Sequence, residues 1–126
     1  MTHLDTPLHK VQGLGSAHSG VTHFWRQRVT AVALIPLVLW FAFSVLRLVG
    51  GSMIDTLTFF QHPLHAVLMA TFMIIVLYHM ALGLQVVIDD YVPSPGGKIA
   101  LLLLARAFAI AVGAACIIAL LRIVIA

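Results

Sequence analysis

The residues of this sequence best suited to ligand binding or proton transfer are one histidine and an adjacent aspartate and tyrosine. His79 lies inside an apolar run, and Asp90 and Tyr91 stand where that run ends. At about 100° per residue, His79, Gly83 and Asp90 share one face of a helix. An ionisable side chain inside a membrane span is costly and by default marks a functional site. A small residue one turn beyond it leaves room for a flat ligand or a closely packed helix.

His79 admits two interpretations. It precedes Asp90 by 11 residues, which places it roughly 16 Å below the membrane surface. There the imidazole needs either a hydrogen-bond partner on another helix, worth about 0.6 kcal/mol, or haem iron, for which neutral imidazole is a favoured ligand. A second axial histidine would have to come from another chain, because His65 lies about 21 Å away along the same helix face. We interpret His65 as an interfacial residue beside Pro63 rather than as the ligand of a second haem.

Asp90, Tyr91 and Arg28 also admit two interpretations each. Asp90 and Tyr91 either end a helix beside the aromatic belt of the membrane or handle protons, with Tyr91 donating to a quinone carbonyl and Asp90 relaying a proton from water. Carboxylates at a helix C-terminus oppose the helix dipole unless they find a partner. Arg28 either anchors the start of the first span or pairs with an anion such as a haem propionate. The residues alone leave these alternatives open.

The elements that position these side chains must be membrane-spanning helices. The chain has 126 residues, of which 62% are hydrophobic and 9% charged, whereas a soluble domain has about 25% charged residues. We therefore predict one all-α integral membrane domain over residues 1–126. The basic residues are scattered, which argues against nucleic-acid binding. The single cysteine, Cys116, lies in an apolar run and is predicted to serve packing rather than redox or metal chemistry.

Three apolar stretches predict transmembrane helices at about residues 24–48, 64–88 and 99–124, and each supplies the roughly 20 residues that a span needs. Pro36 predicts a kink in the first span, and the prolines and glycines of residues 89–98 predict a loop after the second. Residues 1–23 are polar and resemble neither a signal peptide nor a transit peptide, which favours a bacterial inner membrane. The glycine-rich run within them lacks the strand and helix of a nucleotide loop.

The distribution of basic residues predicts the orientation. Four lie on the side of the N-terminus and the Asp90–Tyr91 loop, and two on the opposite side, namely Lys10, Arg26, Arg28 and Lys98 against Arg47 and Arg122. Because basic residues are enriched on the cytoplasmic side, the N-terminus and the Asp90–Tyr91 loop are predicted to be cytoplasmic. With three spans, the C-terminus is then predicted to lie outside.

The spacing His79-x3-Gly83-x6-Asp90-Tyr91 resembles that of the small hydrophobic membrane-anchor subunits of succinate dehydrogenase (complex II), the D-type chains, in the form found in alphaproteobacteria. The run from residue 13 to 17 and the stretch from residue 23 to 31 resemble the same chains, so the resemblance covers nearly the whole sequence. It implies that His79, with Gly83 beside it, is one axial ligand of a b-type haem whose second ligand comes from a C-type anchor subunit. It also implies that Arg28 contacts a haem propionate, and that Tyr91 and Asp90 form part of a ubiquinone site.

The same resemblance implies the partners and the reaction. An iron–sulfur subunit and a flavoprotein would dock on the anchor pair, and electrons from succinate would pass to ubiquinone. The chain has no flavin fold, iron–sulfur cysteines or nucleotide motif, so no residue in it is expected to catalyse succinate oxidation by itself. Two alternatives stay open. One is a quinol–fumarate reductase anchor, and the other is a non-redox membrane protein, such as a structural anchor or a transporter component, with His79 and Asp90 as polar contacts or a proton path.

Overall fold

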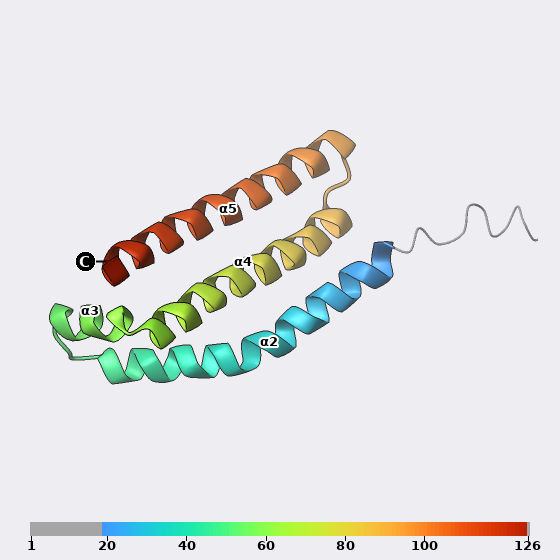
Figure 1. The fold of residues 1–126 in the computed structure, drawn as a ribbon. Coiled ribbons are helices and arrows are strands. Elements are labelled where there is room, and N and C mark those ends of the chain that lie inside the picture. The colour runs from blue at the N-terminus through green and yellow to red at the C-terminus, as the bar shows by residue number, and fades with distance from the viewer. Residues whose placement is uncertain (1–18, 126) are drawn as a thin grey trace, which may run out of the picture.

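The computed structural model describes residues 19–125, and its regular elements are all helices (Figure 1). They are α2 (Ser19–Leu48), α3 (Met53–Gln61), α4 (Pro63–Tyr91) and α5 (Pro95–Ile125). Three of them are long and apolar enough to cross a membrane, α2 from Gly20 onward, α4 and α5. The predicted all-α, three-span architecture is thus confirmed. Of the predicted polar N-terminal segment, residues 1–18 lie outside the described residues, and residues 19–23 form the first turn of α2.

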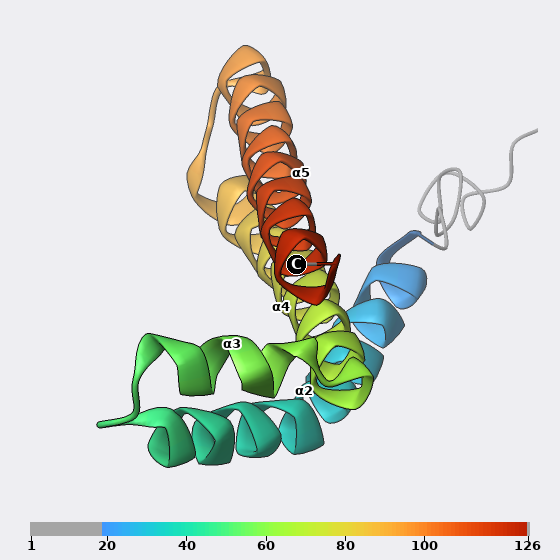
Figure 2. The ribbon, with the colours of Figure 1, turned by 60° about the vertical axis from the view of Figure 1, so that its left-hand side comes forward.

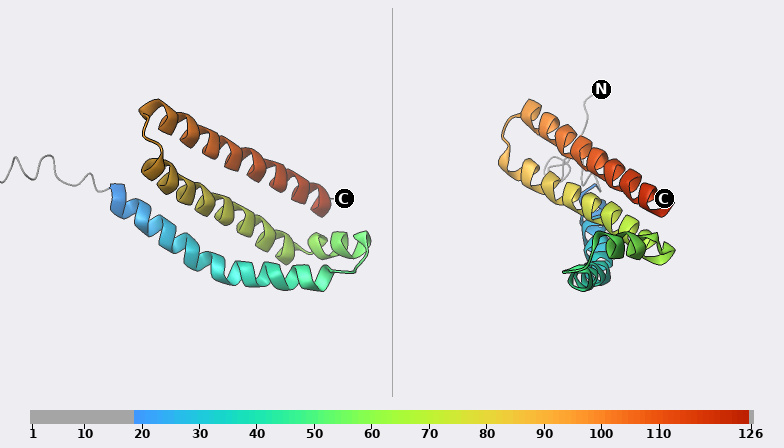
Figure 3. Two further views of the ribbon diagram at one scale, coloured as in Figure 1. Left: turned by 180° about the vertical axis from the view of Figure 1, so that it is seen from behind. Right: turned by 90° about the vertical axis from the view of Figure 1, so that its left-hand side faces the viewer.

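Helix α4 lies in the middle of the bundle. It packs against α2 and against α5, and the short α3 contacts α4 and α5 at one end. Figures 2 and 3 show α2 and α5 on different sides of α4. The buried apolar side chains are correspondingly few, namely Leu34, Phe72, Leu82 and Ile88. Many large apolar side chains face outward, which suits a surface covered by lipid and by other membrane helices.

Local signals explain where the first helices begin and end. Gly50 has a φ of 82°, and such a left-handed residue commonly terminates a helix. Ser52 and Asp55 then form a capping box at the start of α3, and Pro63 lies in the first turn of α4, where its missing N–H is not needed. Pro36 lies inside α2, and Figure 1 shows this helix changing direction near its middle, as a proline predicts.

The link between α4 and α5 is shorter than predicted. We expected residues 89–98 to form a loop, but α4 continues through Tyr91 and α5 begins at Pro95. Helix α5 begins early because proline suits a first helical turn. In addition, the Ser94 hydroxyl accepts a hydrogen bond from the Gly97 N–H at 3.2 Å, as an N-cap residue does. Asp89, Asp90 and Tyr91 therefore form the last turn of α4 rather than a loop.

Candidate functional site

The imidazole of His79 is held from α2 by Thr30. Its Nδ1 lies 2.8 Å from the Thr30 hydroxyl oxygen. That hydroxyl donates its single proton to the backbone carbonyls of Arg26, at 2.8 Å, and Gln27, at 3.1 Å. When the hydroxyl proton goes to these carbonyls, the Thr30 oxygen accepts from His79, and in this arrangement Nδ1 carries the imidazole proton. This assignment leaves Nε2 unprotonated, with its lone pair directed away from Thr30.

Gln27 is the residue that faces this lone pair. Its amide nitrogen lies 3.5 Å from His79 Nε2, which is long for a hydrogen bond. Its carbonyl oxygen, Oε1, is buried and has no hydrogen-bond partner. A buried amide that is only half satisfied is costly, so the Gln27 side chain is weakly held and can be displaced from His79 by a better ligand.

Gly83 borders the same space one turn along α4. A β-carbon at this position would have only the Gln27 amide nitrogen within 4 Å, at 3.7 Å. The space beside Gly83 is therefore bordered by the Gln27 side chain and not by the backbone of another helix. No group of three or more His, Cys, Asp or Glu side chains within residues 19–125 is arranged to hold a metal ion. His79 thus has a hydrogen-bond partner at Nδ1 and a loosely held side chain at Nε2, which is an arrangement common for histidine ligands to metals.

The face of α4 that carries His79 packs along α2. Phe72 stacks on Phe41 of α2, with ring centroids 4.8 Å apart, and His65 lies 6.2 Å from the Trp40 ring. The ring of Phe59 from α3 covers His65 at 3.8 Å, nearly parallel to it, and His65 Nδ1 is buried without a partner. His65 is therefore held by aromatic stacking, whereas His79 is held by a hydrogen bond.

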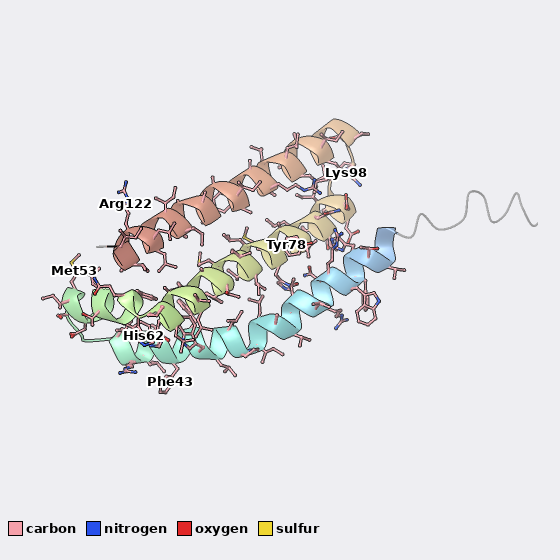
Figure 4. All side chains as sticks on the ribbon, in the orientation of Figure 1. Phe43, Met53, His62, Tyr78, Lys98 and Arg122 are labelled. Carbon is pink, nitrogen blue, oxygen red and sulfur yellow. The ribbon has the colours of Figure 1, made fainter. Side chains whose placement is uncertain are left out.

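The opposite end of α4 presents Asp90 and Tyr91 to the surroundings. Both are exposed, Tyr91 to 81%, and Tyr91 lies about 18 Å from His79 along the helix. Lys98 of α5 caps this helix end, because its Nζ donates a hydrogen bond to the backbone carbonyl oxygen of Asp89 at 2.7 Å. Figure 4 shows Lys98 at the start of α5, beside the end of α4. The predicted pair thus lies at an accessible helix end.

Arg28 is not brought to His79 within this chain. Its guanidinium lies over the Phe24 ring, 5.1 Å from the centroid, in a cation–π contact. Arg28 is exposed, and its helix position puts it on the outer side of α2, away from the face that carries Gln27 and Thr30. A propionate contact would therefore require the group to extend around α2.

Gln27 and Thr30 are the site residues that sequence reasoning did not identify. Both lie in the stretch from residue 23 to 31, where the prediction rested on hydrophobicity, basic residues and the family resemblance alone. The usable signal was their spacing, since polar side chains three residues apart in an apolar helix lie on one face. Such a pair inside a span is expected to face another helix rather than lipid.

Comparison with known proteins places the chain among close relatives. The family model for the succinate dehydrogenase/fumarate reductase transmembrane subunit matches residues 2–119. The chain is 38% identical over 117 residues to a succinate dehydrogenase hydrophobic membrane anchor subunit of Paracoccus denitrificans, covering 93% of this chain and 90% of that one. A subunit of the same name from Rickettsia bellii is 31% identical over 101 residues, which is 80% of this chain and 81% of the relative. No solved structure matches the chain.

Proposed function

The chain belongs to the family of succinate dehydrogenase and fumarate reductase transmembrane subunits, and from this premise we propose that it supplies one axial ligand of a b-type haem and part of a ubiquinone site. As a succinate dehydrogenase membrane anchor it is a multi-pass protein of the bacterial inner membrane. The proposed electron path runs from an iron–sulfur subunit, itself reduced by a flavoprotein, to quinone. A second, C-type anchor subunit would contribute the other axial ligand.

The observation that carries the haem proposal is the hydrogen bond between His79 and Thr30. With Thr30 accepting the Nδ1 proton across this 2.8 Å contact, His79 would offer an unprotonated Nε2 to the iron. Histidine ligands to metals almost always donate their other N–H in this way. Gly83 provides space beside the ligand, and the Gln27 amide is the group to be displaced. When bound, the haem supplies an iron centre that exchanges single electrons.

The quinone site is proposed at the exposed end of α4. The Tyr91 hydroxyl would donate a hydrogen bond to a quinone carbonyl, and the Asp90 carboxylate would pass a proton from water toward the same oxygen. The two residues are exposed in the isolated chain. This exposure is expected if other subunits supply the remaining walls of the quinone site. Arg28 is proposed to contact a haem propionate through its guanidinium fork. In the isolated chain that guanidinium lies over the Phe24 ring. A cation–π contact is weak at an exposed site, so the guanidinium could exchange it for a propionate.

The direction of the reaction is a separate matter. The family includes both succinate dehydrogenases and fumarate reductases, and a haem ligand and a quinone site serve either direction. The relatives that cover most of this chain carry the name of succinate dehydrogenase subunits. We therefore propose succinate oxidation coupled to quinone reduction, with succinate itself handled by the flavoprotein partner.

A dithionite-reduced minus oxidised spectrum of the affinity-purified complex tests this proposal. The wild-type complex should show a b-type signal at about one haem per chain, His79→Ala should lose it, and the matched control His65→Ala should keep it. Both histidines lie on the same face of α4, so general damage to the helix would affect the two variants alike. A full haem signal in His79→Ala would refute the assignment of His79, and a complex without haem in the wild type would leave only a haem-free anchor.

A further inference from the structure

A groove runs along α4 on the side away from His79, between α2 and α5. Its volume is about 780 Å³. It exists because α2 and α5 both pack on α4 and diverge from each other, as Figures 2 and 3 show. Neither His79, Asp90 nor Tyr91 lines it, so it is separate from the site proposed above.

The charged side chains of this groove are arginines from two different helices. Arg26 projects from α2 and Arg106 from α5, and within residues 19–125 no carboxylate lines the groove. Arg106 follows the start of α5 by 11 residues, or roughly 16 Å of helix. A cation at such a depth requires an anion or water. His23 lines the same groove, and its Nε2 is buried without a hydrogen-bond partner.

Beyond the arginines the groove becomes apolar. In the antiparallel pair of α4 and α5, Gln85 lies toward the link between the two helices, whereas Leu77, Ile74 and Gly113 lie progressively farther from it. The groove thus has a cationic end near the predicted cytoplasmic surface and an apolar end in the membrane interior. This gradient matches a molecule with an anionic head and a hydrocarbon tail. A free phosphate ion would leave the apolar end uncovered.

We propose that this groove binds an anionic phospholipid of the cytoplasmic leaflet. The phosphate would lie between the guanidiniums of Arg26 and Arg106, and an acyl chain would cover the apolar floor formed by α4 and α5. Both residues are exposed in this chain, and long arginine side chains reach from positions within a span toward the membrane surface, which brings both guanidiniums toward the depth of lipid phosphates. Basic pockets between transmembrane helices on the cytoplasmic side are known to select anionic head groups.

Native mass spectrometry of the whole delipidated complex tests this inference, with dioleoyl-phosphatidylglycerol and dioleoyl-phosphatidylcholine as probes. The wild-type complex should bind the anionic lipid in preference to the neutral one, and Arg26→Gln combined with Arg106→Gln should weaken the binding of the anionic lipid at least about tenfold. Replacing the same two residues with lysine should preserve most of the preference. Arg122→Gln is the matched control, because Arg122 lies on α5 but outside this groove, and it should bind lipid as the wild type does.

Two results would overturn the inference. One is equal binding of the two lipids by the wild-type complex. This result would refute the preference for an anionic lipid even if the glutamine variant fails to assemble. The other is an undiminished preference in the glutamine variant, which would mean that a partner subunit rather than a lipid fills the groove. Added inorganic phosphate should not displace the lipid, since it offers nothing to the apolar floor. The haem spectrum should be unchanged in the glutamine variant, so a failure here is distinguishable from a failure of the haem assignment.

Discussion

His79 and His65 lie on the same face of α4, 14 residues apart, and both meet α2, but they are held in different ways. His79 has a hydroxyl at Nδ1 and a weakly bound amide at Nε2. His65 has the Phe59 ring against it and the Trp40 ring nearby. Helix periodicity thus identifies which side chains face a neighbouring helix. The partners on that neighbour decide whether a histidine has the hydrogen bonding of a metal ligand or only packs.

The largest of these effects is expected at the quinone site proposed for the C-terminal end of α4. We expect Tyr91→Phe to lower the rate of quinone reduction by roughly 10²-fold, because the phenolic proton is lost from the quinone site. The haem spectrum should stay unchanged. Tyr78→Phe is the matched control, since Tyr78 lies on the same helix in the groove beside α5, and its quinone kinetics should equal those of the wild type. Equal rates for Tyr91→Phe and the wild type would remove Tyr91 from the site.

The second prediction tests whether Thr30 prepares His79. Thr30→Val keeps the shape of the side chain but removes the acceptor for Nδ1–H, and we expect haem affinity to fall about 10- to 100-fold. Thr30→Ser restores the hydroxyl and should recover most of the loss. Haem occupancy and the midpoint potential of the purified complexes provide the measurement. A serine variant as defective as the valine variant would show that Thr30 acts through packing alone.

The third prediction concerns the packing role of His65. We expect His65→Ala to lower the free energy of unfolding by about 2 kcal/mol, because it empties the space beside Phe59 and Trp40. His65→Phe should cost less than about 1 kcal/mol, since an aromatic ring is retained. Thermal unfolding of the assembled complex, followed together with its haem signal, measures both. If haem were lost from His65→Phe, the two histidines would be functionally alike and the contrast would fail.

The smallest expected effect lies at the start of α3, which carries Phe59. Hydrogen bonds from Ser52, from its backbone N–H first and then from its hydroxyl, hold the pKa of the Asp55 carboxyl below its usual range. Stability from these bonds is therefore present above the unfolded-state pKa of about 3.9 and is lost as the pH falls through the lower, folded-state value. Hydrogen exchange of α3 amides, corrected for intrinsic rates, should speed up at low pH relative to α4. In Asp55→Asn this pH dependence should be absent.

Much of the fold could be predicted from the sequence, because length and apolar content decide which segments span a membrane. The three spans and the helix face shared by His79, Gly83 and His65 follow from composition and periodicity. The start of α5 could not be predicted correctly, because Pro95 and its neighbouring glycines are typical of a loop. Hydrogen bonds from the Gly97 and Lys98 N–H groups to Ser94 show that they begin a helix. The Thr30 and Gln27 contacts depend on how two helices are placed against each other, which a single sequence does not specify.

The lengths of the two connections have a consequence for how the chain is built in the membrane. Only residues 92–94 separate α4 from α5, and three extended residues reach about 10 Å, close to the distance between packed helices. These two helices must therefore enter the bilayer side by side as one hairpin. Helix α2 is joined through α3 and its flanking turns and is synthesised first, so it can diffuse before docking. We therefore expect the contact between Thr30 and His79 to form when α2 docks on α4, after α4 and α5 have entered the membrane together.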